Sequence, residues 1–470
     1  MPTSPIVRAV IRHFLLALSL PASAVFILVL QSLCVPAARA VTLEQWWASA
    51  QNHSPIVRAT RAQEAAALES SVQAQAVLRP SVDLSVSRSL NQVDQQVAGT
   101  AGQVRQQSLN YQSRNETLTL RQPIWRPGAS ALQKAASATI EQSRAETKFE
   151  SRQLLEQLAE LHLERLLTKT QLDASQMQKA RVREQMKAAE LAIVAGTGTR
   201  TDLDELNVRL HEIEARDMEL ILRQKQLMAR LERLSGLAVS ADLFNLETGQ
   251  STSAHQRISL LSTMELEADW SWLNLSAELQ LLDAQLDELS AQLAQRKAQH
   301  SPSLDLVAQL ARSDAETVTN PTSGYRNHVL GIQLRMPLYA GGQLTSQVRQ
   351  LVYQLEAAHA RRDERLQELT AQAESFKLTM LSSHERLSAL SLAVQAAQLA
   401  VHSAQMSLQA GVRSRLDLLA AEQQLSDLAV EQQRTAYQHA LAWLRLMNIK
   451  DGVNPANIML FDRVVTGVRP

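Results

Sequence analysis

The sequence predicts an α+β fold that is built by tandem duplication of one helix–strand–strand–helix unit. Three observations support this prediction. The two halves share motifs at a nearly constant offset, each half holds a long run without glycine or proline, and each half holds segments in which apolar and polar residues alternate. The chain of 470 residues has only 14 glycines and 13 prolines, so long uninterrupted elements are expected.

The duplication is clearest in two pairs of short motifs. Residues 120–125 read LRQPIW, and residues 334–339 read LRMPLY, 214 positions later. A second pair, at an offset of 215, aligns AGTGTRTDL from Ala195 with AGVRSRLDL from Ala410. Equal landmarks at equal spacing predict two related structural repeats. We place the first repeat at 41–240, a linker at 241–256, the second repeat at 257–450 and a tail without long periodicity at 451–470.

Each repeat contains one very long predicted helix. The runs 129–195 and 343–410 are 67 and 68 residues long and free of glycine and proline. At 1.5 Å per residue, each would extend about 100 Å, far beyond a globular helix. An ordinary coiled-coil rod would show the same pattern. Shorter helical runs, which could stack end to end beside the long ones, are expected at 56–79, 202–235, 257–299 and 416–449.

Two alternating segments in each repeat predict strands. In the fourth segment Leu330, Ile332 and Leu334 share one face, and Gln333 and Arg335 lie on the other. Period-two alternation over about ten residues is typical of a half-exposed strand, although a soluble hairpin would show it too. The four strands are expected near 81–91, 112–124, 303–313 and 328–339.

Aromatic residues favour a membrane location for these strands. The chain is only 4% aromatic, yet Tyr111 and Tyr325 begin their expected strands, and Trp125 and Tyr339 end theirs. Fourteen tilted residues cover roughly 35 Å, which suits two interfacial girdles around an apolar band. Lipid exposure demands a closed barrel, and four strands cannot close. A dimer would supply 8 strands and a trimer 12, and the trimer could leave a passage.

The N-terminus has the features of a cleaved signal peptide at 1–40. Arg8 and Arg12 precede an apolar run at 14–30, and an Ala-Arg-Ala site ends at Ala40; an uncleaved anchor is the alternative. Cleavage would remove Cys34, the only cysteine, which excludes a disulfide scaffold. No later stretch reaches about 18 uncharged apolar residues, so no transmembrane helix is expected.

Composition and motifs exclude several classes of function. The formal net charge is zero, which argues against nucleic-acid binding. His211 with Glu214, and His384 with Glu385, have no further ligand at metal spacing. No nucleophile or phosphate-binding loop accompanies the carboxylates near residue 202. We therefore expect neither an enzyme nor a cofactor.

The signal peptide, the duplicated unit, the LRQPIW and LRMPLY motifs followed by glycine, and the AG turns together resemble the TolC family of outer-membrane export ducts. This resemblance spans nearly all of 41–450. It implies a homotrimer with a 12-stranded transmembrane β-barrel in the Gram-negative outer membrane and a long α-helical coiled-coil tunnel in the periplasm. It also implies contact with outer-membrane lipid, a periplasmic adaptor (membrane fusion protein) and an inner-membrane transporter.

The resemblance leaves the exported substrate open. It slightly favours type I protein secretion over small-molecule efflux with a proton-driven pump. A periplasmic coiled-coil adaptor is the alternative from another class, but an adaptor would lack the duplication and would have a glycine-containing β domain. A structural coiled coil would not explain the repeated strands.

The resemblance also implies a gate at the two turns of the long helices. Gly196 and Gly411 mark these turns. By residue match, Asp417 would line an acidic constriction, and Arg413 and Asp202 would form a salt link between neighbouring helix pairs.

Two features complicate the gate. Ala420 stands where the family can place a second acidic ring, and Leu408 stands where it can place a tyrosine. In addition, Thr199-x-x-Asp202 and Ser414-x-x-Asp417 match capping boxes, so these residues could serve helix capping as well as gating.

Overall fold

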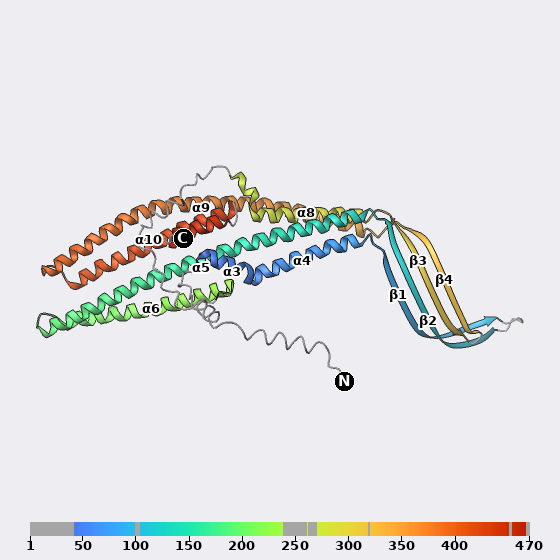
Figure 1. Ribbon diagram of the computed structural model, residues 1–470, viewed down its shortest axis with the longest axis horizontal. Coiled ribbons are helices and arrows are strands. Elements are labelled where there is room, and N and C mark those ends of the chain that lie inside the picture. Colours follow the sequence, from blue (N-terminus) through green and yellow to red (C-terminus); the bar gives the residue numbers. More distant parts are fainter. Residues whose placement is uncertain are drawn as a thin grey trace, which may run out of the picture.

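The protein is long and narrow, with helices along most of its length and a sheet at one end (Figure 1). The computed structural model describes residues 42–98, 104–237, 261, 270–317, 320–450 and 454–466. The expected signal peptide at 1–40 and the expected linker at 241–256 lie outside the described residues.

Two long helical hairpins form the body of the protein. Helix α5 (Gly128–Val194) folds back onto α6 (Arg200–Ser235), and α9 (Gln343–Gln409) folds back onto α10 (Arg415–Lys450). The long helices have 67 residues each and the returning helices 36 each. The two halves therefore match in length, as expected of a tandem duplication.

Shorter helices lie beside the sheet-proximal part of each long helix (Figure 1). Helix α4 (Pro55–Ala76) packs against α5, and α8 (Ala277–Ala298) packs between α5 and α9. The sequence predicts one helix over 257–299, but the α-helix found in the described part of this range is α8, which begins only at Ala277. A 3₁₀ turn, η2 (Ser271–Leu275), precedes α8, and α8 begins where the Ser276 hydroxyl accepts a hydrogen bond from the Leu279 N–H at 3.3 Å.

A hydrophobic core joins the helices near the middle of the body. The core includes Trp46 of α3 (Leu43–His53), Trp443 of α10 and Phe461 of α11 (Pro455–Thr466), and all three side chains are 0–2% exposed. The tail was expected to lack periodicity, but α11 is amphipathic because Ile458, Phe461 and Val465 recur at helical spacing and are buried.

A carboxylate at this core caps one helix from another. Asp462 of α11 accepts hydrogen bonds from the backbone N–H groups of Leu43 at 3.0 Å and Glu44 at 3.2 Å, at the N-terminus of α3. Burial raises the pKa of Asp462 to about 6, and the two N–H donors oppose that rise. The end of the chain is therefore tied to its beginning by polar as well as apolar contacts.

The stacked helices meet at a non-covalent joint. Gly236 ends α6 with φ 71°, and a Cβ at this position would lie 2.2 Å from the His53 ring at the end of α3. The Ser49 hydroxyl donates a hydrogen bond of 2.7 Å to the carbonyl of Ser235. Glycine is required here both by its positive φ and by the close approach.

One described helix could cross a membrane by length and composition alone, which the sequence analysis did not anticipate. It is α9, with a mean hydropathy of 1.2 over 18 residues. In the structure α9 packs along α10 on one side, where Leu387, Ala397 and Ala404 are buried, and 17% of the apolar window is buried.

The sheet has four antiparallel strands in chain order. The strands are longer than expected, because the paired segments continue past the apolar residues towards the hairpin turns. The fourth strand ends earlier than 339, since Pro337 has no N–H to donate. The first and last strands are both sheet edges. The strands are β1 (Ser81–Ala98), β2 (Val104–Trp125), β3 (Ser303–Thr317) and β4 (Asn320–Arg335), in the order β1-β2-β3-β4.

The strand register separates an apolar face from a polar face. One cross-strand row contains Val82, Leu120, Ala308 and Leu330, and all have even numbers. We call this the even face. The odd face carries rows such as Asp83, Thr119, Gln309 and Val329. In the isolated chain Leu84, Leu330 and Leu334 of the even face are 69%, 75% and 66% exposed, so this face needs an apolar environment.

The register corrects the predicted aromatic girdle. Tyr111 pairs with Asn91, and Tyr325 pairs with Ser313, so both tyrosines lie within strands rather than at their starts. Both also lie on the odd face, away from the apolar rows. Tyr339 lies beyond the end of β4.

Of the four predicted girdle residues, Trp125 alone shares the even face. A register shift between Pro123 and Trp125 places Trp125 opposite Leu304. Proline cannot donate to the ladder, which accounts for an irregularity at this point.

Adjacent residues of β4 provide a test of the two faces. We expect Ile332→Arg, on the even face and inside the apolar band, to destabilise the membrane-inserted protein by roughly 2–4 kcal/mol, because the charge would enter hydrocarbon. Gln333→Arg, one residue away on the odd face, is the matched control and should have little effect. Unfolding of the lipid-reconstituted protein in denaturant measures both. Equal losses for the two variants would contradict the assignment of the faces.

Candidate functional site

The two turns at the tips of the hairpins have the same backbone structure. In the first, Gly196 N–H donates to the Ile193 carbonyl and Thr197 N–H to the Ala192 carbonyl, at 3.0 and 2.9 Å. In the second, the Gly411 and Val412 N–H groups make the equivalent bonds to Leu408 and Ser407, at 3.0 and 2.9 Å. This is the Schellman arrangement, and it requires the positive φ of 72° at Gly196 and 73° at Gly411.

Each returning helix is capped directly after its turn. The Thr199 hydroxyl accepts a hydrogen bond from the Asp202 N–H at 3.2 Å. At the second tip the Ser414 hydroxyl accepts from the Asp417 N–H at 3.2 Å, and the Ser414 N–H donates to the Asp417 carboxylate at 3.1 Å. The second tip therefore has a reciprocal capping box, and the capping role foreseen from the sequence is present at both tips.

Capping also fixes the charge of Asp417. The hydrogen bond from the Ser414 N–H is the largest cause that lowers the pKa of Asp417; the Ser414 side chain and the positive charge of Arg413 lower it further. Asp417 is fully exposed. Its carboxylate therefore stays ionised to a lower pH than an ordinary aspartate, at the end of the hairpin.

A cavity of about 300 Å³ lies between the two tips. Asp202 lines it from the first tip, and Arg413 and Leu408 line it from the second. The structure thus brings the predicted salt-link partners to one cavity, but the ion pairs found among the described residues do not include Asp202 with Arg413. Asp417 does not line this cavity.

The polar contacts between the two hairpins lie further from the tips, at residues that the sequence analysis missed. Arg181 of α5 forms an ion pair of 3.4 Å with Glu422 of α10. Arg209 of α6 donates to the Gln423 side-chain oxygen at 2.9 Å, and Gln178 of α5 donates to the same oxygen. Glutamines on a long helix carry no motif, so the sequence alone offered no signal for this link.

A groove of about 760 Å³ accompanies these contacts. Arg209 and Glu205 of α6 face Asp427 and Ala420 of α10 across it. Ala420, where the family can place an acid, leaves space in this groove rather than charge. Near the tips the two hairpins are therefore joined by these polar side chains and by a small apolar contact that includes Leu206 and Leu419. The large apolar core that joins α5 to α10 lies nearer the middle of the body.

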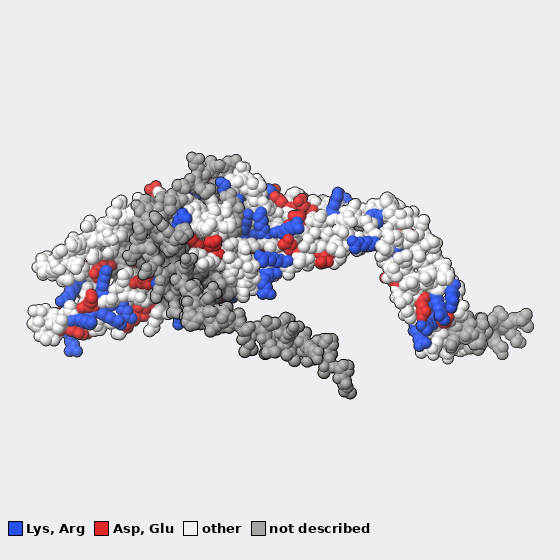
Figure 2. All heavy atoms as spheres, viewed as in Figure 1, with Lys and Arg blue, Asp and Glu red and all other residues white. Residues whose placement is uncertain are grey.

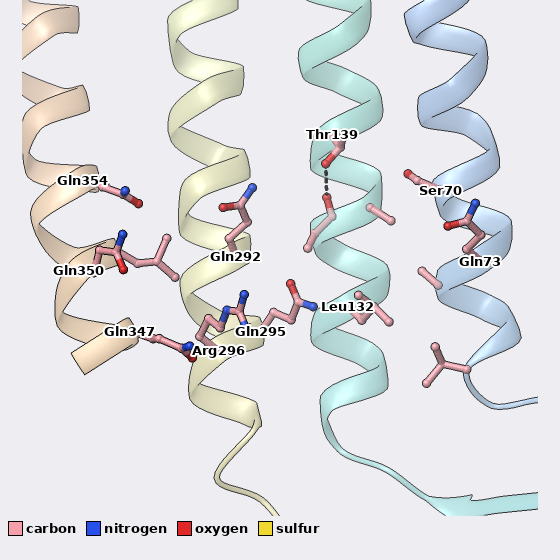
Figure 3. Close-up of a pocket in the computed structure, with 15 residues that line it drawn as sticks. Ser70, Gln73, Leu132, Thr139, Gln292, Gln295, Arg296, Gln347, Gln350 and Gln354 are labelled. Atoms are coloured by element: carbon pink, nitrogen blue, oxygen red, sulfur yellow. Dashed lines mark hydrogen bonds between the residues drawn. The ribbon is translucent and has the colours of Figure 1, made fainter. Parts of the chain in front are cut away.

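A second lined cavity lies at the sheet end of the helices, where α4, α5, α8 and α9 run side by side (Figure 3). Its volume is about 670 Å³. Most of the polar side chains that line it are neutral amides, which bind neither cations nor anions strongly. They are Gln73, Gln292, Gln295, Gln347, Gln350 and Gln354, with Arg296 as the charged member.

The chain is duplicated, its helical hairpins are about 100 Å long, and its sheet is apolar on one face and open at both edges. These features define a class of protein: a membrane-anchored duct built from several chains. The chain belongs to the outer membrane efflux protein family, whose pattern matches residues 46–237 and 271–450.

Curated relatives cover most of this chain. It is 29% identical over 374 residues to the alkaline protease secretion protein AprF of Pseudomonas aeruginosa. The aligned region covers 79% of this chain and 76% of AprF. It is 27% identical to the proteases secretion protein PrtF of Dickeya chrysanthemi, over 93% of this chain and 94% of PrtF.

Solved structures show the same fold. The Campylobacter jejuni CmeC outer membrane channel superposes with a TM-score of 0.69 over 90% of this chain and 89% of CmeC, at 13% identity. Together with the family match, these findings confirm the predicted resemblance. The chain is an export channel protein of the Gram-negative outer membrane that extends into the periplasm, and it is not an enzyme.

Proposed function

We propose that three copies of this chain form one continuous conduit across the outer membrane and the periplasm. The observation that supports this most directly is the pair of unpaired strands at the edges of the sheet, β1 and β4. Hydrocarbon offers no partner for their backbone groups, so β4 of each subunit must pair with β1 of the next. The directions alternate along β1-β2-β3-β4, so this junction is antiparallel and a barrel of 12 strands can close.

The helical tips form the gate of this conduit. Asp417 is fully exposed and ionised, and three copies around a narrow opening would focus negative potential there. Asp202 and Arg413 line one cavity between the two hairpins of each subunit. The large apolar core that joins the hairpins lies nearer the middle of the body, and the links closer to the tips are few, so a docking partner can separate the tips at modest cost.

The cargo of the conduit is protein delivered by a type I secretion system. Two of the relatives that align over most of this chain, AprF and PrtF, are named for protease secretion. In such a system an inner-membrane transporter and a periplasmic adaptor would deliver an unfolded polypeptide to the tips. The amide-lined cavity near the sheet suits this cargo, because neutral side chains do not retain charged segments.

Cysteine cross-linking tests the trimer. Cys34 is the only cysteine, so cysteines placed on the edge strands form the only bridges in the mature chain. We expect Ser85→Cys on β1, combined in turn with Val329→Cys, Gly331→Cys or Gln333→Cys on β4, to give a three-chain product in isolated membranes. The matched control places the second cysteine at Thr117 of β2, which lies directly opposite Ser85 within the same chain and should give only a monomer with an internal bridge. A monomer in the soluble periplasmic fraction would contradict the proposal.

Conductance in planar bilayers tests the gate. We expect Arg413→Ser combined with Asp202→Ala to raise single-channel conductance, because it removes charge from the cavity between the tips. Asp417→Ala should lower cation selectivity instead, and in the wild type that selectivity should persist at a pH where an ordinary aspartate is neutral.

The control for the gate is Ser414→Ala, which removes the cap at about 1 kcal/mol but keeps the carboxylate. It should lower thermal stability and leave selectivity unchanged. If Asp417→Ala and Ser414→Ala behave alike, with altered stability and unaltered conductance and selectivity, the tip residues act as helix caps only.

Deletion of the gene in its own host tests the cargo. We expect proteins to disappear from the culture medium and accumulate in the cell, and the wild-type gene to restore export. Tolerance of small toxic compounds should change little. Unchanged extracellular protein with increased sensitivity to dyes or detergents would assign the channel to small-molecule efflux instead.

A further inference from the structure

A cluster of arginines lies on the even face of the sheet, between the apolar rows and the hairpin turns. The register forms one row from Val86, Glu116, Arg312 and Arg326, and the next from Arg88, Arg114, Asp314 and Gly324. On the face in view, Figure 2 shows a group of charges near the end of the sheet that is remote from the helices, and almost none on the part next to the helices. We call Arg88, Arg114, Arg312 and Arg326 the arginine belt.

The belt lies at a defined height in the membrane. Arg326 and Leu334 are on the same face of β4, eight residues apart. This separation corresponds to about 26 Å along the strand and about 20 Å along the barrel axis at a tilt of 40°. The helices enter the sheet at the Leu334 end and extend into the periplasm. The belt therefore lies at the opposite boundary, beside the headgroups of the outer leaflet.

The cross-strand pairing within the belt is unfavourable in the absence of an anion. Arg88 lies directly opposite Arg114, and Arg312 directly opposite Arg326. Like charges in this position repel each other. Two acids compensate in part: Glu116 contacts Arg114, and Asp314 forms an ion pair of 3.0 Å with Arg312. Four arginines and two acids leave two excess positive charges per chain.

The excess charge lies on the two edge strands. Arg88 of β1 and Arg326 of β4 are exposed, and among the described residues neither forms an ion pair. The next acid on this face of β1 is Asp94, six residues beyond Arg88 and about 20 Å away. The hairpin connections, 99–103 and 318–319, contain no acidic residue. These two arginines are therefore open to an anion from outside the chain.

We propose that the arginine belt binds the phosphate groups of lipopolysaccharide, the phosphorylated glycolipid of the outer leaflet, with Arg326 of one subunit and Arg88 of the next forming a site at each subunit boundary. This proposal rests on the trimer proposed above, in which β4 pairs with β1 of the neighbouring subunit. Guanidinium groups bind phosphate oxygens bidentately. The next row towards the helices contains Leu84, Leu118, Leu310 and His328, and the rows beyond it, with Leu330 and Ile332, suit the acyl chains of the same lipid.

The proposal predicts a lipid preference that two substitutions abolish. Purified trimers are reconstituted into phosphatidylcholine vesicles that contain lipopolysaccharide with a short sugar core, either intact or enzymatically dephosphorylated. The midpoint of thermal trimer dissociation should be higher with the intact lipid. Arg88→Gln combined with Arg326→Gln should remove this difference and lower binding of intact lipopolysaccharide about tenfold or more, the loss expected for charge-assisted contacts.

The matched control is Arg335→Gln, which removes the same charge from the odd face of β4 and should keep the preference. Trimer yield in pure phosphatidylcholine shows whether each variant assembles. If the double variant does not assemble, the single variant Arg326→Gln is tested in its place. Equal stabilisation by intact and dephosphorylated lipid, or an equal loss in Arg335→Gln, would overturn the belt as a phosphate site. If the proposed trimer is wrong, the wild-type protein will give no trimer in any vesicle, so this result is distinguishable from loss of the lipid preference alone.

Discussion

The unpaired backbone groups along β1 and β4 are the constraint on which the rest of the structure depends. A sheet with two open edges is not stable in hydrocarbon, so a single chain cannot complete the membrane-spanning part of the molecule. An even number of strands keeps every junction antiparallel, and duplication of a two-stranded unit guarantees an even number. The same duplication gives helices of matched length, so all hairpin tips end at one level. The register then decides which residues meet lipid and which meet water.

Much of the fold could be predicted because it follows from periodicity. The long helices begin and end within a residue of the expected positions, since glycine marks each turn at Gly196 and Gly411. Face assignment within the strands could not be predicted for the aromatics. Tyr111 and Tyr325 have odd numbers, like the polar residues, while Trp125 changes face through a bulge next to Pro123 that no single-strand pattern reveals.

The candidate site could be predicted in part for a related reason. Capping residues have a local signature, so Thr199 and Ser414 were found with their partners. Contacts between hairpins depend on how two helices are rotated relative to each other. That rotation brings Arg209 and Gln423 together across the groove and keeps Arg413 beyond ion-pair distance of Asp202. Neither outcome is encoded in the spacing of residues along one helix.

The non-covalent joint between Ser235, Gly236 and His53 has a mechanical consequence. Helix α6 ends there, while α5 continues past the same level without a break. Helices α3 and α6 can therefore rotate relative to each other at the joint, whereas α5 can follow only by curving along its length. The 36 residues of α6 form a lever of about 54 Å from the joint to the tip. A pivot of about 5° would displace the tip by about 5 Å, the scale of hinge motions in domains that open and close. In the proposed conduit, small rotations at the middle of the molecule would therefore change the aperture at the far end, with the tryptophan-containing core as the pivot.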